Sequence, residues 1–142
     1  MVVNPYDNMR HEIKYLIPTH SEVELKNLLA IQGWKILFPR RVVHTIYFDT
    51  INNEFLYDSI YGLSNRVKYR ARWYNNDRQF VVETKKKSAG VGTKIISNSF
   101  SFNSELPPEG MLVECIRQFS NTDLLQKSKV SYVREYYIHS NS

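Results

Sequence analysis

The stretch Arg66-Val67-Lys68-Tyr69-Arg70-Ala71-Arg72-Trp73-Tyr74 alternates without a break between cationic and mostly apolar side chains. A period of two is typical of a β-strand whose two faces meet different environments. Neighbouring cations on one face lie about 7 Å apart, because a strand rises roughly 3.3 Å per residue. Their repulsion is costly unless water or an anion screens it. The cationic side chains, all on one face of the predicted strand, are Arg66, Lys68, Arg70 and Arg72. This face is either a solvated sheet face or an anion-binding face.

Size and composition fit one globular domain. The chain has 142 residues, and its 10 Tyr and 7 Phe suit a sheet protein. A formal net charge of +5 favours an anionic partner, and phosphate compounds, nucleic acid and a membrane surface satisfy that clue equally. The single Cys115 excludes an internal disulfide, and no apolar run approaches the roughly 20 residues that span a bilayer. Because the N-terminus has no secretory signal, the expected location is cytoplasmic.

The hydrophobic pattern predicts an α+β fold. Strands are expected at residues 9–17, 42–49, 66–74, 78–87, 93–102 and 129–139. Helices are expected at 22–32 and 110–119, with a short one at 122–126. Ser21 and Glu24 have the spacing of a capping box, and Gly33 is the expected end of the first helix. Segment 54–65 gives no decisive pattern.

These strands are expected to form one curved antiparallel sheet that stays open. Closing a small barrel takes about eight strands, and the chain supplies six candidates. Helices are expected to cover the outer, apolar face, which leaves a tunnel-like but incomplete barrel with a basic interior. The open sheet edge also predicts self-association by strand pairing.

Cations on other strands are in phase with the central row, so an antiparallel sheet would gather them on one side. The cations in phase are Arg10, Lys14, Lys85 and Lys87, and they are joined by Lys94 at the start of the fifth expected strand and Arg134 on the sixth. Arg and Lys in such numbers suit a polyanion, since a guanidinium matches phosphate oxygens in pairs. Glu12 and Glu83 lie among these cations. Each either helps to hold a divalent metal that bridges phosphates or simply pairs with a neighbouring cation.

Five short motifs, taken in order and spacing, resemble the VTC domain. That domain is the polyphosphate polymerase domain of the triphosphate tunnel metalloenzyme superfamily, which is CYTH-like. Each motif alone is weak, whereas the series is specific. The matching segments are Arg10 to Tyr15, Tyr47 to Thr50, Lys68 to Tyr74, Glu83 to Lys85, and Tyr132 to Arg134.

The resemblance implies an antiparallel β-tunnel lined by Lys, Arg and Glu. It also implies transfer of phosphoryl groups from ATP or another triphosphate to inorganic polyphosphate, with Mn²⁺ or Mg²⁺ as the cofactor. Glu12 and Glu83 would hold the metal, and Arg70, Arg72 and Lys85 would be catalytic by holding the transferred phosphates. The implied phosphate-binding residues are Lys14, Arg66, Lys68, Arg70, Arg72, Lys85, Lys87, Lys94 and Arg134.

Two departures from the family pattern bear on catalysis. A Lys-x-Arg motif is expected in the fifth strand, where this chain has Lys94-Ile95-Ile96. Residues 1–142 are also expected to lack the last strands of the full domain, with a further basic pair and a metal-binding glutamate. A binding module without turnover and an inorganic triphosphatase therefore remain alternatives to the polymerase. Specific nucleic-acid binding is not expected.

Overall fold

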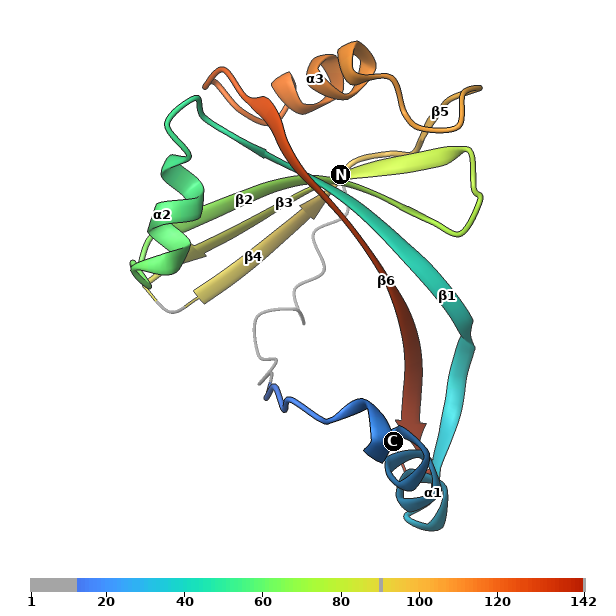
Figure 1. Ribbon diagram of the computed structural model, residues 1–142. Coiled ribbons are helices and arrows are strands. Elements are labelled where there is room, and N and C mark those ends of the chain that lie inside the picture. The colour runs from blue at the N-terminus through green and yellow to red at the C-terminus, as the bar shows by residue number, and fades with distance from the viewer. Residues whose placement is uncertain (1–12, 90, 142) are drawn as a thin grey trace. The chain divides into compact units, whose positions relative to one another are not determined.

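The computed structural model describes residues 13–89 and 91–141 (Figure 1). The chain forms two compact units, and the larger one, here called the core unit, contains Val43–Tyr132. The second unit combines residues 13–42 with residues 133–141. The elements in chain order are η2 (Thr19–Ser21), α1 (Glu22–Ile31), β1 (Trp34–Asp49), α2 (Glu54–Ile60), β2 (Arg66–Tyr74), β3 (Gln79–Ser88), β4 (Val91–Ile96), β5 (Phe100–Ser101), α3 (Glu109–Arg117) and β6 (Leu125–His139).

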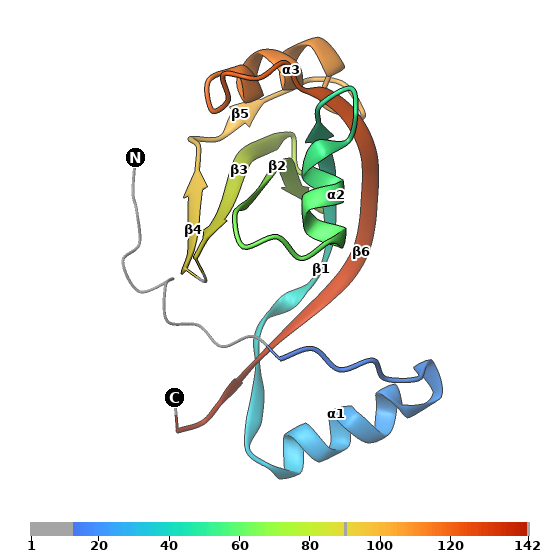
Figure 2. The same ribbon diagram turned by 90° about the vertical axis from the view of Figure 1, so that its left-hand side faces the viewer.

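Within the described residues, the strands form a six-stranded sheet in the order β4-β3-β2-β1-β6, and β5 pairs with β3 outside this path. The pairs β1–β2, β2–β3, β3–β4 and β3–β5 are antiparallel, and the path does not close on itself. Figure 2 shows β4, β3 and β2 side by side, with α2 alongside β2. The predicted open antiparallel sheet in an α+β chain is confirmed.

The apolar side of β2 builds the hydrophobic core. Tyr69, Ala71 and Trp73 are at most 6% exposed. They share one buried cluster with side chains of β1, β3 and α3, so the predicted division of β2 into two faces is confirmed for its apolar side. The amphipathic spacing of α3 places three of its side chains in this cluster, namely Leu112, Cys115 and Ile116. The cysteine is therefore a core residue, as its position on a helix face suggests.

Asp49 fixes the connection between β1 and α2. Its Oδ1 accepts hydrogen bonds from the backbone N–H groups of Thr50 at 2.7 Å and Phe55 at 3.0 Å, and its Oδ2 accepts one from Leu56 at 2.9 Å. The carboxylate thus satisfies amide groups that the first turn of a helix leaves without partners. Asn53 has φ of +57°, a left-handed conformation that asparagine tolerates better than most residues. These contacts explain a helix in a segment whose pattern is not decisive.

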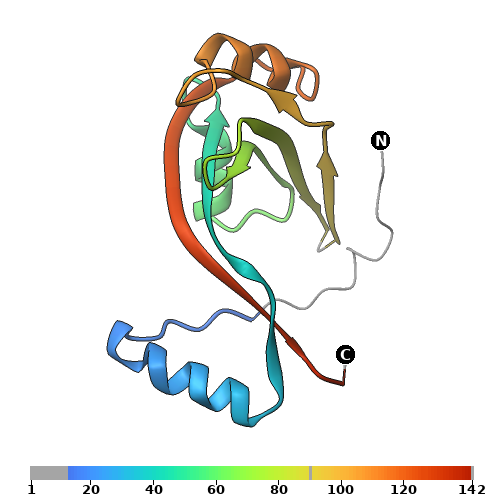
Figure 3. The ribbon, with the colours of Figure 1, turned by 90° about the vertical axis from the view of Figure 1, so that its right-hand side faces the viewer.

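The expected fifth strand is interrupted. β4 ends at Ile96, and β5 resumes at Phe100 along the same side of β3 (Figure 3). Between them, Ser97 bonds Val82 twice: its N–H donates to the Val82 carbonyl at 2.9 Å, and its Oγ accepts from the Val82 N–H at 2.8 Å. The serine hydroxyl replaces a backbone partner there, so the chain leaves the regular ladder.

Several local predictions are wrong. Residues 13–17, the described part of the first expected strand, have no strand structure, and Leu16 is fully exposed. Alternation alone does not make a strand, because a strand needs a neighbour to satisfy its backbone. No helix forms at 122–126, where Leu124 is buried in the core and β6 begins at Leu125. Ser21 makes no side-chain capping bond, and a 3₁₀ turn precedes α1 instead.

The second unit joins α1 to the neighbouring parts of β1 and β6. Lys26 donates to Glu135 at 2.9 Å, and Cζ of Arg41 lies over the ring of Tyr136 at 4.9 Å from its centroid. Gly33 ends α1 with φ of +83°, as predicted. None of the residues of α1 is buried, so its expected packing on the sheet is not seen. β1 begins at Trp34, earlier than expected.

Candidate phosphate-binding face

Strand register brings three lysines into one row across the sheet. Lys68 of β2 is directly opposite Lys85 of β3, and Lys85 is directly opposite Lys94 of β4. Directly opposite residues in antiparallel strands share a face, with Cβ atoms about 4.5–5.5 Å apart. We call this the lysine row. Like charges in such positions oppose strand pairing, so the row weakens the sheet when no anion is present.

The same face continues on both sides of the lysine row. Arg66 pairs in register with Lys87, and Arg70 pairs with Glu83. On β2, β3 and β4 together, this side of the sheet carries one carboxylate, that of Glu83, against seven cationic side chains. We call this surface the cationic face, and its cations are Arg66, Lys68, Arg70, Arg72, Lys85, Lys87 and Lys94.

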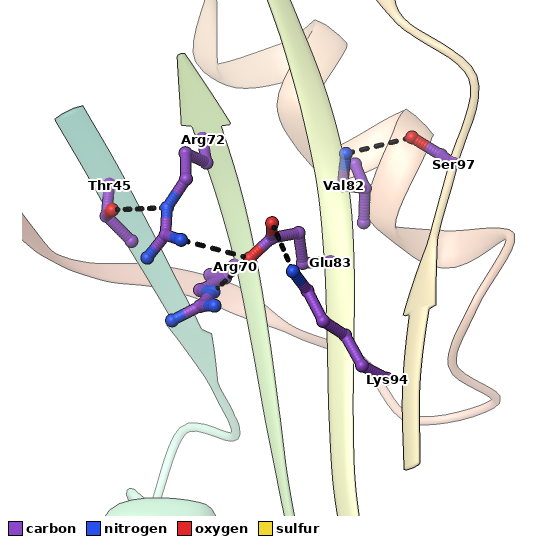
Figure 4. A network of polar contacts seen from close by, with 7 residues as sticks. All are labelled: Thr45, Arg70, Arg72, Val82, Glu83, Lys94 and Ser97. Carbon is purple, nitrogen blue, oxygen red and sulfur yellow. Dashed lines mark hydrogen bonds and ion pairs between the residues drawn. The ribbon is translucent and has the colours of Figure 1, made fainter. Parts of the chain in front are cut away.

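Glu83 is the centre of an ion-pair cluster (Figure 4). Its Oε2 lies 2.5 Å from Arg70 Nε and 3.5 Å from Arg72 Nη1, and its Oε1 lies 3.3 Å from Lys94 Nζ. The glutamate is only 3% exposed. Three cations therefore surround one buried carboxylate. Of the two roles considered for Glu83, metal binding and ion pairing, this arrangement corresponds to ion pairing.

The electrostatics of Glu83 follow from this setting. Burial by itself raises the pKa of the carboxyl group, because it penalises the charged form. The charges of Arg70, Arg72 and Lys94, together with the hydrogen bond from Arg70, outweigh burial and leave the pKa below its ordinary value. Glu83 is thus an anion at neutral pH, and it holds the cations around it in fixed positions.

Arg72 is oriented by a residue that the sequence patterns do not single out. Its Nε donates to Thr45 Oγ1 at 3.3 Å, while its Nη1 faces Glu83. Arg72 is 7% exposed and Thr45 is 1% exposed, so the pair is buried. Thr45 lies on β1, directly opposite Arg72 of β2. The only sequence signal for this contact was the alternation of β1, which places Thr45 on one defined face of the strand.

Comparison with known protein families matches residues 9–142 to the VTC domain. The chain belongs to the VTC domain family. A search among curated proteins found no match. The match covers both compact units, so the family relationship extends over nearly the whole chain. It supports a polyphosphate-related function and an interaction with polyphosphate or triphosphate.

The structure groups most of the predicted phosphate-binding residues of this VTC domain, but not all. Lys14 and Arg134 belong to the second unit, and both are exposed. Lys14 is not on a strand, contrary to its expected place. Glu12 lies outside the described residues. The phosphate-binding and catalytic roles of the predicted residues stay predictions.

The departure from the VTC pattern at Lys94-Ile95-Ile96 falls beside the ion-pair cluster. Ile96 is directly opposite Glu83 on β4, and it is 41% exposed. The arginine expected from the resemblance would stand at this position, on the cationic face. Its replacement leaves Glu83 with Arg70, Arg72 and Lys94 as its cationic partners.

The described residues near Glu83 do not fit a protein-held Mn²⁺ or Mg²⁺. These cations prefer several oxygen ligands, and carboxylates are the usual protein ligands. Asp49 uses its carboxylate for backbone amides, whereas Glu83 faces three cations. No group of three or more potential His, Cys, Asp or Glu ligands occurs in residues 13–89 and 91–141.

Within the described chain, no helix is long and apolar enough to cross a membrane.

Proposed function

We propose that the cationic face binds the phosphates of inorganic polyphosphate and of triphosphates, and that the domain transfers phosphoryl groups from ATP to polyphosphate. The lysine row carries this proposal. Lys68 and Lys85 face each other in register, both are exposed, and neither has a carboxylate partner in the described structure. Such an arrangement lowers the stability of the free sheet and gains free energy when an anion with many charges lies across it.

The two kinds of cation have different roles in the proposed binding. Arg70 uses Nε for Glu83, which leaves its terminal nitrogens for phosphate oxygens. Arg72 is restrained by Thr45 and Glu83 and presents a fixed charge. Lys85 is exposed and acts as a mobile point charge.

In the proposed reaction, a terminal oxygen of polyphosphate attacks the γ-phosphorus of ATP. A new P–O–P linkage forms, the bond to the β-phosphate oxygen breaks, and ADP leaves. Arg70, Arg72 and Lys85 would position the phosphates and offset the charge that spreads over the transferred group. The described residues offer no group of three or more potential His, Cys, Asp or Glu ligands for a metal in this step.

Two experiments test the proposal. Calorimetry with tripolyphosphate at low and high salt should show binding that weakens strongly with salt, because screening acts over about 10 Å at 0.1 M. Incubation with ATP and polyphosphate, with Mn²⁺ or Mg²⁺ supplied, should yield one ADP for each phosphate unit added to polyphosphate. Absence of tripolyphosphate binding at low salt would refute the binding function.

A binding module without turnover is the second candidate. It is favoured by the single carboxylate of the cationic face, since Glu83 is already paired with Arg70, Arg72 and Lys94. Salt-sensitive binding without ADP formation would establish this alternative. Release of orthophosphate from tripolyphosphate would instead identify an inorganic triphosphatase. A cytoplasmic location is part of the proposal.

A further inference from the structure

A mostly apolar cavity of about 280 Å³ adjoins the cationic face within the core unit. Its walls come from the end of β1, helix α2 and the start of β6, and they include the aromatic side chains of Tyr47 and Phe55. A concave site with apolar and aromatic walls and a few polar groups has the usual character of a small-molecule pocket.

The cavity and the cationic face share residues. Lys68 belongs to the lysine row and also lines the cavity. Tyr47 lines it too, and it is directly opposite Arg70 on the neighbouring strand. The cavity therefore borders the cationic face at Lys68 and Tyr47.

Two polar groups of the lining are relevant to a bound ligand, namely those of Ser59 and Lys127. Ser59 lines it, and the Ser59 Oγ is buried without a hydrogen-bond partner in the described structure. An unpaired buried hydroxyl costs free energy that a polar ligand atom recovers. Lys127 also lines the cavity, and its Nζ is held by the Ile51 carbonyl at 3.0 Å. The lining thus offers one unused hydroxyl and two ammonium groups, from Lys68 and Lys127.

We propose that this cavity accepts the nucleoside part of a nucleoside triphosphate whose phosphates lie on the cationic face. Inorganic polyphosphate has no apolar part to fill such a space, whereas a nucleobase is flat, largely apolar on its faces and polar at its edges. The inference rests on the proposed function, because it takes the cationic face as the phosphate site. It adds a means of distinguishing ATP from an inorganic triphosphate.

The test fills the cavity without touching the cationic face. Val130 lines the cavity and is 42% exposed, so Val130→Trp adds bulk at its rim with little effect on the core. Val133 lies on the same strand, is 49% exposed and does not line the cavity, which makes Val133→Trp the matched control. Ser59→Ala removes the unpaired hydroxyl without adding bulk.

Calorimetry with ATP and with tripolyphosphate, on the full chain with a chelator present, gives the readout. Val130→Trp should weaken ATP binding by on the order of tenfold, which is about 1.4 kcal/mol, and leave tripolyphosphate binding unchanged. Ser59→Ala should weaken ATP binding by roughly fivefold with the same selectivity, since one hydrogen bond contributes about 1 kcal/mol. Val133→Trp should change neither. Thermal melting checks that each variant is folded.

The outcomes separate this inference from the function on which it rests. Wild-type protein that binds no tripolyphosphate refutes the proposed function. Wild-type protein that binds tripolyphosphate, with ATP affinity unchanged in both Val130→Trp and Ser59→Ala, overturns the nucleoside site alone. Equal weakening of ATP and tripolyphosphate binding in both cavity variants overturns it as well, because the cavity would then affect only the phosphates.

Discussion

Lys85→Met should stabilise the free protein and weaken its binding of polyphosphate. Lys85 is the middle member of the lysine row, with Lys68 opposite on one side and Lys94 on the other. If the ammonium groups lie about 6 Å apart in water, each pair repels by roughly 0.7 kcal/mol. Screening by 0.1 M salt reduces this to about 0.4 kcal/mol per pair. Removing the central charge should therefore raise the free energy of unfolding by about 0.8 kcal/mol.

The same substitution removes a contact with phosphate. A charge-assisted contact contributes roughly 1–3 kcal/mol, so the affinity for tripolyphosphate should fall by about fivefold to about 150-fold. Urea unfolding measures the first effect and calorimetry the second. At 1 M salt the gain in stability should nearly disappear, because the screening length is then about 3 Å.

Lys86→Met is the matched control. Lys86 adjoins Lys85 on β3 but has the opposite parity, and its register partners are Val67 and Thr93. It therefore has no directly opposite lysine, and its loss should change neither stability nor affinity appreciably. The reasoning would be refuted if Lys85→Met lowered the free energy of unfolding, or if both variants lost the same affinity.

Substitutions at three further positions examine the ion-pair cluster. Thr45→Val should weaken tripolyphosphate binding severalfold through the loss of about 1 kcal/mol of hydrogen bonding to Arg72, and Thr45→Ser should restore it; calorimetry of both variants decides. Ile96→Arg should tighten binding by roughly tenfold by adding a cation opposite Glu83, and unchanged affinity would count against the cationic face as the binding site. The charge of Glu83 should stabilise the fold fully above its ordinary pKa of 4.5 and progressively less as pH falls through the lowered pKa. Glu83→Gln should therefore lose roughly 3 kcal/mol of stability at pH 7 and show a smaller decline in acid, as measured by urea unfolding from pH 3 to 7.

The strand Arg66–Tyr74 was predictable because cationic side chains alternate with mostly apolar ones along its whole length. Period alone decides which side chains share a face, and burial of Ala71 and Trp73 then decides which face meets the core. The position of Lys85 on the same side as Lys68 was equally accessible from parity. Their direct opposition depended on the register of the β2–β3 hairpin, which parity does not specify.

Other features depend on contacts that local patterns do not record. The break between β4 and β5 results from the hydrogen bonds of Ser97 with Val82, residues fifteen positions apart in the chain. Helix α2 depends on Asp49, which stands before the turn and not at the usual capping position. The role of Thr45 likewise required the pairing of β1 with β2, since Arg72 is 27 residues away.

The cationic face divides into two parts with different physical roles. Around Glu83, opposite charges meet at low exposure, so removing Arg70 would leave a buried carboxylate with fewer partners and destabilise the fold. Along the lysine row, like charges meet at the surface, so removing Lys85 relieves repulsion. A loss of affinity in an Arg70 variant would therefore combine a structural effect with a binding effect. A loss in a Lys85 variant, accompanied by a gain in stability, has no structural explanation and would locate the anion on this face.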